Sequence, residues 1–221
     1  MLTLPPDFAG CNSCGFVPDS GRPRLCPRCG TSQRQRSFKQ LFWARLRKEI
    51  FAQRSPENGL LLSPGPVERT LLFPQLRQYT VSSLYQTYTG IGPYVRADVR
   101  DLAPFQDDTF DYVQACNVLD YVPELDQALC AIHRVLRPDG LFVFLIPERN
   151  LLQGIEPICV STHATVTGRY WPDPTTVPFV RLGRQTLRDM LLQTGFAAEE
   201  VRYVEPLSGA RCTWWLCRPG P

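Results

Sequence analysis

The stretch from Tyr94 to Pro147, YVRADVRDLAPFQDDTFDYVQACNVLDYVPELDQALCAIHRVLRPDGLFVFLIP, decides the fold of this 221-residue chain. Two short apolar runs, 110–116 and 141–147, flank an amphipathic segment between Pro123 and Arg137. Such runs are typical of buried strands, and the segment between them has the period of a helix. Because parallel strands need a crossover of a dozen or more residues, the stretch predicts a strand–helix–strand unit of a parallel sheet.

Short apolar runs elsewhere supply the remaining strands of an α/β sheet. We predict further strands at 60–63, 79–83, 94–98, 201–205 and 212–217, a helix ending near residue 72, and a final helix over 187–193. Strands that alternate with helices indicate a Rossmann-like sheet with helices on both faces, closed by an antiparallel hairpin. The segment 149–181 is rich in Pro, Thr and Gly. Because long ordered loops tend to be functional, we interpret it as a lid-like insertion.

Composition indicates a folded protein of the cytoplasm. Hydrophobic residues make up 43% of the chain, and the formal net charge is +3. No run of about eighteen apolar residues occurs, so we expect no membrane span. The N-terminus lacks a basic region followed by an apolar stretch, so no secretory signal is predicted.

Two CxxCG segments, Cys11–Gly15 and Cys26–Gly30, indicate a metal site near the N-terminus. A tetrahedral zinc ion takes four thiolates, and two such segments supply them from two directions. The glycine after each second cysteine permits a positive φ, which turns backbone N–H groups toward the thiolates. Disulfides are disfavoured in a reducing compartment. The predicted ligands are Cys11, Cys14, Cys26 and Cys29, and the closed ligand set gives the zinc a structural role.

A basic, amphipathic helix is predicted after this zinc ribbon. Ser32 is a candidate N-cap, and the helix reaches to about Gln53. Ten basic residues face a single acid, Glu49, in this part of the chain: Arg22, Arg24, Arg28, Arg34, Arg36, Lys39, Arg45, Arg47, Lys48 and Arg54. Two interpretations stay open, a solvated helix face and a phosphate-binding patch.

Four motifs resemble those of class I S-adenosylmethionine-dependent methyltransferases of the type 11 kind. Asp98–Phe105, DVRDLAPF, is similar to the family's D-x-x-x-L-P-F loop with one added residue, and Thr109–Val113, TFDYV, to its S-F-D-x-V strand. Val118–Val122, VLDYV, stands where the family has V-L-E-H-V, and Arg134–Gly140, RVLRPDG, where it has R-V-L-K-P-G-G. The resemblance implies a Rossmann-like class I sheet and S-adenosylmethionine as the cofactor.

The ends of the chain resemble a bacterial subgroup of this family that carries an N-terminal zinc ribbon. Cys26–Arg36, CPRCGTSQRQR, is similar to the subgroup's C-P-x-C-G-S-x-x-R-x-R segment, and Val180–Phe196 is similar to a motif near its C-terminus. We therefore predict three parts: a zinc ribbon at 1–33, a connecting helix at 34–56 and a methyltransferase domain at 57–221.

The resemblance also implies which residues hold the cofactor. Asp98 would accept a hydrogen bond from the adenine amino group, and the Val99 N–H would meet the adenine ring. The methionine end would lie near Ser63, Gly65 and Asn117. Ser83 stands at the end of the second strand, where the family has an acid for the ribose hydroxyls.

Two departures from the family pattern bear on this site. Ser82-Ser83 replaces the ribose acid, and the first turn reads Ser63-Pro64-Gly65-Pro66 without the usual glycine pattern. A lost charge-assisted hydrogen bond weakens binding by roughly ten- to a hundredfold. The candidates for a general base or acid, with no choice among them, are Tyr121, Glu148 and His163.

Three functions remain open. The first is methyl transfer to a small-molecule or saccharide-like metabolite, and the second is a repurposed, non-catalytic binding subunit. The third is RNA methylation, but the aromatic side chains of the basic helix fall on its apolar face, so nucleic acid is an unfavoured partner. A protein partner could dock on the zinc ribbon or the basic helix.

Overall fold

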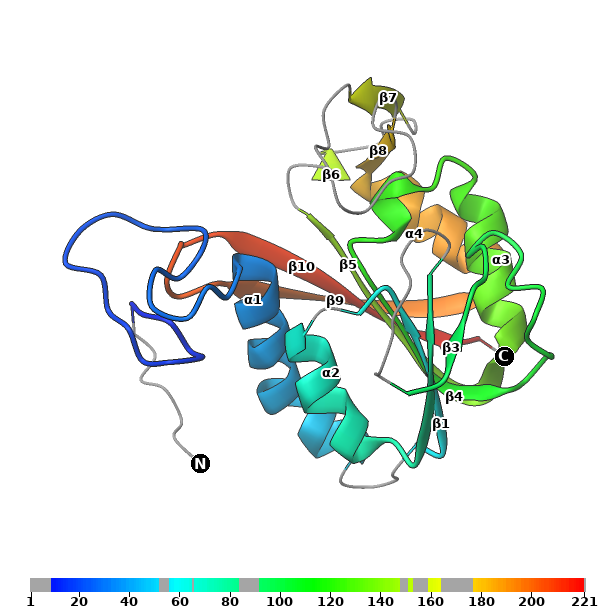
Figure 1. The fold of residues 1–221 in the computed structure, drawn as a ribbon. Helices are drawn as coiled ribbons and strands as arrows, with labels where there is room; N and C mark the ends of the chain where they lie inside the picture. The colour runs from blue at the N-terminus through cyan, green and yellow to red at the C-terminus, as the bar shows by residue number, and fades with distance from the viewer. Residues whose placement is uncertain are drawn as a thin grey trace.

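A seven-stranded sheet forms the body of the protein (Figure 1). The computed structural model describes residues 9–51, 56–64, 66–83, 92–147, 151–152, 159–163 and 177–220. The strands of the sheet are β1 (Asn58–Leu62), β2 (Gln78–Ser82), β3 (Tyr94–Val95), β4 (Phe110–Cys116), β5 (Leu136–Pro147), β9 (Phe196–Val204) and β10 (Arg211–Pro219). Their order is β3-β2-β1-β4-β5-β10-β9. The first five are parallel, whereas β10 runs antiparallel to both β5 and β9.

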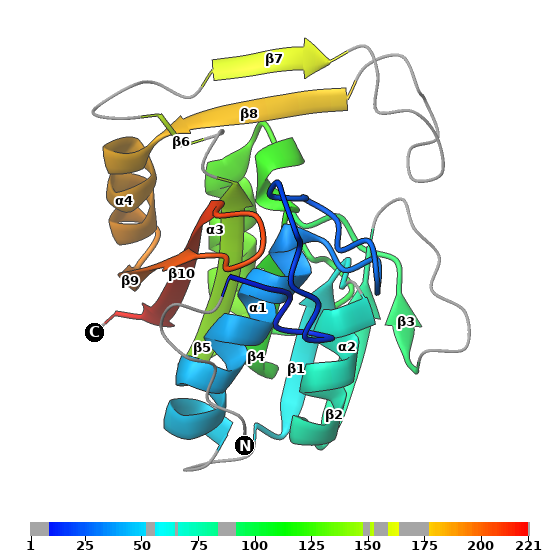
Figure 2. The same cartoon turned by 90° about the vertical axis from the view of Figure 1, so that its left-hand side faces the viewer.

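Helices cover both faces of the sheet, as the sequence predicts. On one face lie α1 (Gln33–Leu41), its continuation η1 (Phe42–Phe51) and α2 (Pro66–Leu72), and on the other lie α3 (Leu125–Val135) and α4 (Arg184–Gln193) (Figures 1 and 2). Because strand side chains alternate between faces, neighbours in one strand enter different cores. Trp214 packs with the core under α1 and η1, whereas Trp215 packs with the core under α3 and α4.

The helix after the ribbon begins as predicted but changes its geometry. Ser32 forms a capping box with Gln35, in which each side chain bonds the other residue's backbone N–H. From Phe42 onward the helix has π geometry. Leu41, Leu46 and Phe51 are buried and recur every five residues, which the wider π turn keeps on one face.

Three of the predicted strands have clearly different limits in the structure, and one of them, β9, begins at Phe196 instead of residue 201. The third is only two residues long, because after Val95 the chain enters the turn that begins at Asp98. The fifth begins at Leu136 instead of residue 141, and its pairing with β4 shifts register between Leu136 and Leu141. The Asp139-Gly140 segment therefore lies within an irregular strand.

A second, three-stranded sheet lies beyond the carboxyl ends of β4 and β5 (Figures 1 and 2). It consists of β6 (Leu151–Leu152), β7 (Cys159–His163) and β8 (Val177–Gly183), in the order β6-β8-β7. Strand β8 packs against η3 (Leu119–Tyr121), the short turn that follows β4. Among the described residues, no helix is long and apolar enough to cross a membrane.

Candidate functional site

Two serines join the carboxyl ends of β1 and β2. The Ser63 hydroxyl lies 3.1 Å from the Ser83 hydroxyl, and the Ser63 N–H donates to the Ser82 carbonyl at 2.8 Å. The Tyr94 hydroxyl donates to the Ser83 carbonyl at 3.0 Å and so ties this point to β3. Two residues predicted to hold the cofactor thus meet where ligands of open parallel sheets usually bind, outside the carboxyl ends of the strands.

Asn117 lies beside these serines, at the end of the neighbouring strand β4. Both Asn117 and Ser63 have a left-handed backbone, with φ values of 54° and 47°. Such a conformation costs a non-glycine residue about 1–2 kcal/mol, and these residues cluster at functional sites. Asn117 Oδ1 and Ser82 Oγ are buried without a hydrogen-bond partner. Because unpaired buried polar atoms are rare, these two atoms fit a polar ligand that lies across the strand ends.

Asp98 is bound by an arginine that the sequence motif does not mark. Its carboxylate accepts hydrogen bonds from the backbone N–H of Arg100 at 2.9 Å and from Arg100 Nη2 at 2.6 Å. The Arg100 hydrogen bond outweighs the effect of burial and holds the pKa of the Asp98 carboxyl below its ordinary value. The Asp98 carbonyl also accepts from the N–H of Leu102, so Asp98 shapes the turn. Its role toward adenine stays a prediction, as does that of half-buried Val99.

The structure describes only some of the other predicted site residues. Tyr121 lies in η3, half-buried, between Asn117 and the packing contact of β8. His163 is the last residue of β7, where it pairs with Val177, and its side chain lies outside the described part of the chain. Gly65 and Glu148 lie outside the described residues.

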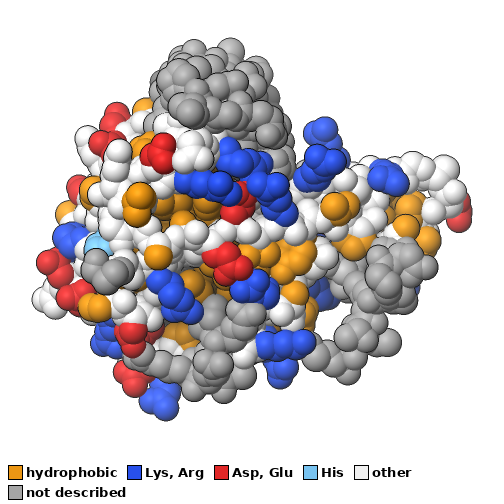
Figure 3. All heavy atoms as spheres, turned by 180° about the vertical axis from the view of Figure 1, so that it is seen from behind, with side chains coloured by type: hydrophobic (Ala, Val, Ile, Leu, Met, Phe, Trp, Pro, Cys, Tyr) orange, Lys and Arg blue, Asp and Glu red, His pale blue; other side chains and the backbone are white. Residues whose placement is uncertain are grey.

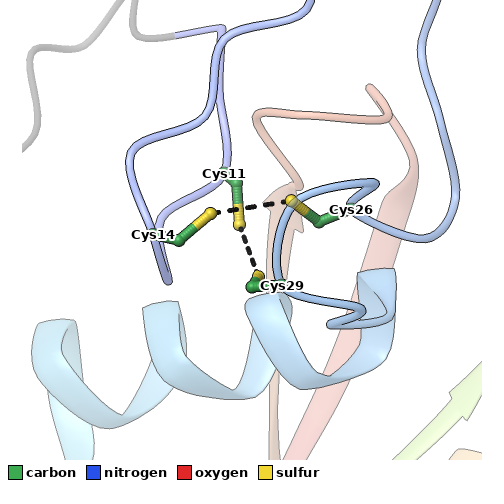
Figure 4. A group of neighbouring side chains, drawn as sticks. All are labelled: Cys11, Cys14, Cys26 and Cys29. Carbon is green, nitrogen blue, oxygen red and sulfur yellow. Dashed lines mark hydrogen bonds between the residues drawn. The ribbon is translucent and has the colours of Figure 1, made fainter.

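The four predicted metal ligands converge (Figure 4). The Cys11 and Cys29 sulfurs are 3.7 Å apart, those of Cys14 and Cys26 are 3.6 Å apart, and all four lie within 4.8 Å of one another. With Zn–S bonds of about 2.3 Å, a tetrahedron separates its sulfurs by about 3.8 Å, so the cluster fits a zinc ion.

The backbone of both cysteine segments has the predicted shape. Gly15 and Gly30 have φ values of 74° and 69°. Burial would raise the pKa of the Cys29 thiol, but hydrogen bonds from Thr31 and neighbouring thiols lower it to about 6. A thiol that ionises near neutral pH suits metal binding, because the thiolate is the ligand.

Arg36 fastens the ribbon to the sheet. Its guanidinium is fully buried and pairs with the Glu205 carboxylate at 2.7 and 2.9 Å. It also donates to the carbonyls of Arg24 and Thr31, on either side of the second cysteine segment. Leu207, in the turn between β9 and β10, packs against Cys11 and Cys26.

The basic residues of the connecting helix pair with acids of the α/β domain. Arg36 binds Glu205, and Arg45 binds Glu199 through two hydrogen bonds of 3.0 and 3.1 Å. On the face seen from behind, basic and acidic side chains lie next to one another (Figure 3). Of the two interpretations of the basic run, the exposed Arg45–Glu199 pair favours the solvated helix face, whereas Arg36 is buried and holds the ribbon.

Arg34, the first arginine of the R-x-R part of the ribbon motif, reaches the same edge of the sheet as Ser63 and Asn117. Its Nη1 lies 3.5 Å from the carbonyl oxygen of Cys116, the residue before Asn117, and its Nε lies 3.5 Å from Glu68 Oε1 in α2. Arg34 and Cys116 are 82 positions apart. Only the fold brings them together, so the motif that contains Arg34 does not predict its place beside the strand ends. Arg100, by contrast, is two positions from Asp98.

The strand order and the helices on both faces form a Rossmann-like sheet of the kind found in class I methyltransferases. Residues 76–144 match the methyltransferase domain family of type 11. That segment spans β2 to β5 and leaves out β1 and its turn, where the sequence departs from the family pattern.

Known proteins resemble parts of the chain. It is 31% identical over 123 residues to the ubiquinone/menaquinone biosynthesis C-methyltransferase UbiE of Blochmanniella pennsylvanica, covering 48% of this chain and 46% of that protein. It is 49% identical over 43 residues to the mitochondrial arginine-hydroxylase NDUFAF5 of Mus musculus, covering 20% of this chain and 12% of that protein. The chain spans about half or less of the curated relatives it matches.

A solved structure agrees with the fold along most of the chain. The 1,6-didemethyltoxoflavin-N1-methyltransferase of Burkholderia thailandensis, determined with its substrate and S-adenosylhomocysteine, has a TM-score of 0.55. It is 16% identical, and the match covers 91% of this chain and 94% of that one. At this identity the likeness establishes the fold alone.

Proposed function

We propose that the protein binds S-adenosylmethionine at the edge formed by Ser63, Ser83 and Asn117 and transfers its methyl group to a small-molecule or saccharide-like metabolite. Two left-handed residues, Ser63 and Asn117, lie at the ends of adjacent strands. Two buried polar atoms nearby, Asn117 Oδ1 and Ser82 Oγ, have no hydrogen-bond partner among the described residues, and this combination carries the proposal. The relatives that are named as C- and N-methyltransferases support the reaction class.

The chain's own part in this reaction would be to bind and position. S-adenosylmethionine, when bound, supplies a methyl group on a sulfonium that is already activated toward a nucleophile. Ser63 and Asn117 present polar groups along one edge, which fixes the orientation of a ligand and lowers the entropic part of the barrier. Tyr121, beside Asn117, has a hydroxyl that can accept or donate a proton. Strand β8 packs on η3, the turn that contains Tyr121.

Two observations favour the second candidate, a binding subunit without methyl transfer. The end of β2 carries serines where the family has an acid, and Arg100 occupies the Asp98 carboxylate. The arginine-hydroxylase relative indicates that similar sequences serve other chemistry as well. Transfer of label from methyl-labelled S-adenosylmethionine to the metabolite fraction of a cell extract separates the candidates. Label in the RNA fraction alone would instead establish RNA methylation.

Calorimetry with S-adenosylhomocysteine tests the site itself. Asn117→Gly should keep the fold within about 1 kcal/mol, because glycine accepts the positive φ while adding chain entropy. It should nevertheless weaken binding about tenfold, because the amide that meets the ligand is lost. The matched control is Asp108→Gly, since Asp108 also has a positive φ, 50°, but lies before β4 at the opposite end of that strand. No binding by the unaltered protein, or equal affinity in both variants, would refute the proposed site.

The four cysteines support a second proposal, a structural zinc ion. The sulfur separations and the closed ligand set favour folding over catalysis. Metal analysis of the purified protein should find one zinc per chain, and Cys29→Ser should lower that content. A zinc-free preparation with an intact ribbon would contradict the proposal of a structural zinc ion.

A further inference from the structure

Arg34 lies at the end of β4, next to α2, the helix that follows β1. It belongs to the first turn of α1, next to the ribbon, and its guanidinium is 29% exposed. One side of this group faces the carbonyl of Cys116 at the end of β4, and another faces Glu68 in the helix that follows β1. The cation therefore contacts the end of β4, directly before Asn117, and the helix that follows the turn at Ser63.

Glu68 is the second observation that marks this place. Its carboxylate is fully buried, no N–H or O–H group of the described residues donates a hydrogen bond to it, and it forms an ion pair with Arg34 at 3.5 Å. An ionised carboxylate without hydrogen bonds is unfavourable in a protein interior. Nearby Tyr112 and Cys116 are also buried, and burial raises the pKa of both groups well above their ordinary values. The contact with Glu68 on one side and with the Cys116 carbonyl on the other fixes the position of the Arg34 guanidinium at the end of β4.

The donor and acceptor groups at this edge match an α-amino acid. Arginine presents N–H donors in a planar fork that pairs with a carboxylate. Asn117 Oδ1, on the residue after Cys116, is a buried acceptor without a partner. A carboxylate and an ammonium on one carbon would satisfy both groups at once, and the methionine end of the cofactor carries that pair.

We propose that Arg34 binds the carboxylate of the amino-acid end of S-adenosylmethionine, that Asn117 Oδ1 accepts from its ammonium, and that Glu68 is a positioning residue for Arg34. The proposal builds on the cofactor site described under the proposed function. It also gives the ribbon a part in that site. Arg34 is two residues from Arg36, whose ion pair with Glu205 fixes both the ribbon and the start of α1.

Two ligands separate recognition of the amino-acid end from a general structural effect. S-adenosylhomocysteine carries that end, whereas 5′-methylthioadenosine keeps the nucleoside and the thioether and lacks it. By calorimetry, Arg34→Gln should bind S-adenosylhomocysteine about ten- to a hundredfold more weakly and bind methylthioadenosine unchanged. Arg34→Lys should recover part of the loss, and Glu68→Gln should show a smaller selective loss. The matched control, Arg45→Gln, removes another arginine of the same helical segment and should change neither affinity.

The outcomes distinguish this proposal from the cofactor site on which it depends. If the unaltered protein binds neither ligand, the proposed function and this inference both fail. Alternatively, the unaltered protein binds both ligands while Arg34→Gln weakens the binding of both equally, or of neither. Arg34 then does not bind the amino-acid end, and this inference alone is overturned. Melting temperatures of the variants, measured in parallel, show whether an equal loss comes from a weakened fold.

Discussion

Arg36 carries a buried charge that holds distant parts of the chain together. Its side chain and that of Glu205 are both fully buried, and the two residues are 169 positions apart. Removing one partner of such a pair leaves the other charge buried and uncompensated, which costs about 3–5 kcal/mol. We therefore expect Arg36→Ala to lower the free energy of unfolding by about that amount, measured by urea denaturation.

An exposed pair on the same helical segment supplies the control. Arg45 and Glu199 are 31% and 54% exposed, and pairs in water contribute only about 0.2–1 kcal/mol. Arg45→Ala should therefore cost less than about 1 kcal/mol. Similar losses for Arg36→Ala and Arg45→Ala would show that burial does not strengthen the Arg36 pair.

The Glu205 carboxyl should make stability depend on pH. Burial alone would raise its pKa, but hydrogen bonds from Arg36, Ser208 and the Leu207 N–H lower it below the ordinary value of 4.5. A group whose pKa is lower in the folded state stabilises the fold above its unfolded pKa. That contribution should be lost as the pH falls from 4.5 through the lower folded value. Urea denaturation across this range should show the loss, and Glu205→Gln should remove this part of the pH dependence; an unchanged profile would contradict it.

At the scale of elements, the passage from α4 to β9 depends on Gly195. Its φ is 85°, and a Cβ there would lie 2.9 Å from Nε2 of His133 in α3. Gly195→Ala should therefore lose about 1–3 kcal/mol of stability, through backbone strain and the shift of a packed ring. Thermal or urea unfolding measures the loss. In an His133→Ala background the steric part should disappear, so equal losses in both backgrounds would show that the backbone alone is responsible.

The sequence predicts elements well where the pattern is local. The apolar runs of β4 and β10, the helix α3 between β4 and β5 and the Ser32 cap all arise from neighbouring residues. The two-residue length of β3 was not predictable from its apolar run, because the turn that Asp98 organises ends the strand early. The sequence pattern does not predict the π geometry of η1 either. Leu41, Leu46 and Phe51 suit a five-residue spacing, but the other apolar residues fit an ordinary helix.

In the candidate site, too, local patterns predict some residues, whereas the packing of distant elements brings in others. Ser63, Ser83 and Asn117 could be predicted because each ends a strand, and strand ends of a parallel sheet share one edge. The ribbon motif includes Arg34 but does not predict its position, and no motif includes Glu68, because the meeting of these residues with Cys116 depends on how α1 and α2 pack. Asp98 was predicted from a motif, yet its carboxylate already has a partner in Arg100.

At the scale of the whole molecule, the ribbon and the two ends of the chain form one connected structure. The Trp214 indole N–H donates to the Ser37 hydroxyl at 2.7 Å, and Leu207 packs against two of the cysteines. Because Arg34, Ser37 and Arg36 lie on one helix, loosening the ribbon would loosen the start of α1. The predicted zinc ion should therefore influence the cofactor edge as well as the ribbon.

Removal of zinc tests this connection. Thiolate sites of this kind contribute folding free energy, so chelation at neutral pH should lower the melting temperature and unfold the ribbon. Because Arg34 would lose its fixed position, the metal-free protein should bind S-adenosylhomocysteine more weakly, while its affinity for methylthioadenosine changes less. Re-addition of zinc should restore both properties.

Cys29→Ser should reproduce the effect, whereas Cys130→Ser should not, because Cys130 is an exposed thiol of α3 outside the cluster. An unchanged melting profile after verified removal of the metal would refute the structural role. If the melting temperature falls and the affinities for both ligands change equally, zinc has the structural role, but the ribbon does not fix the position of Arg34.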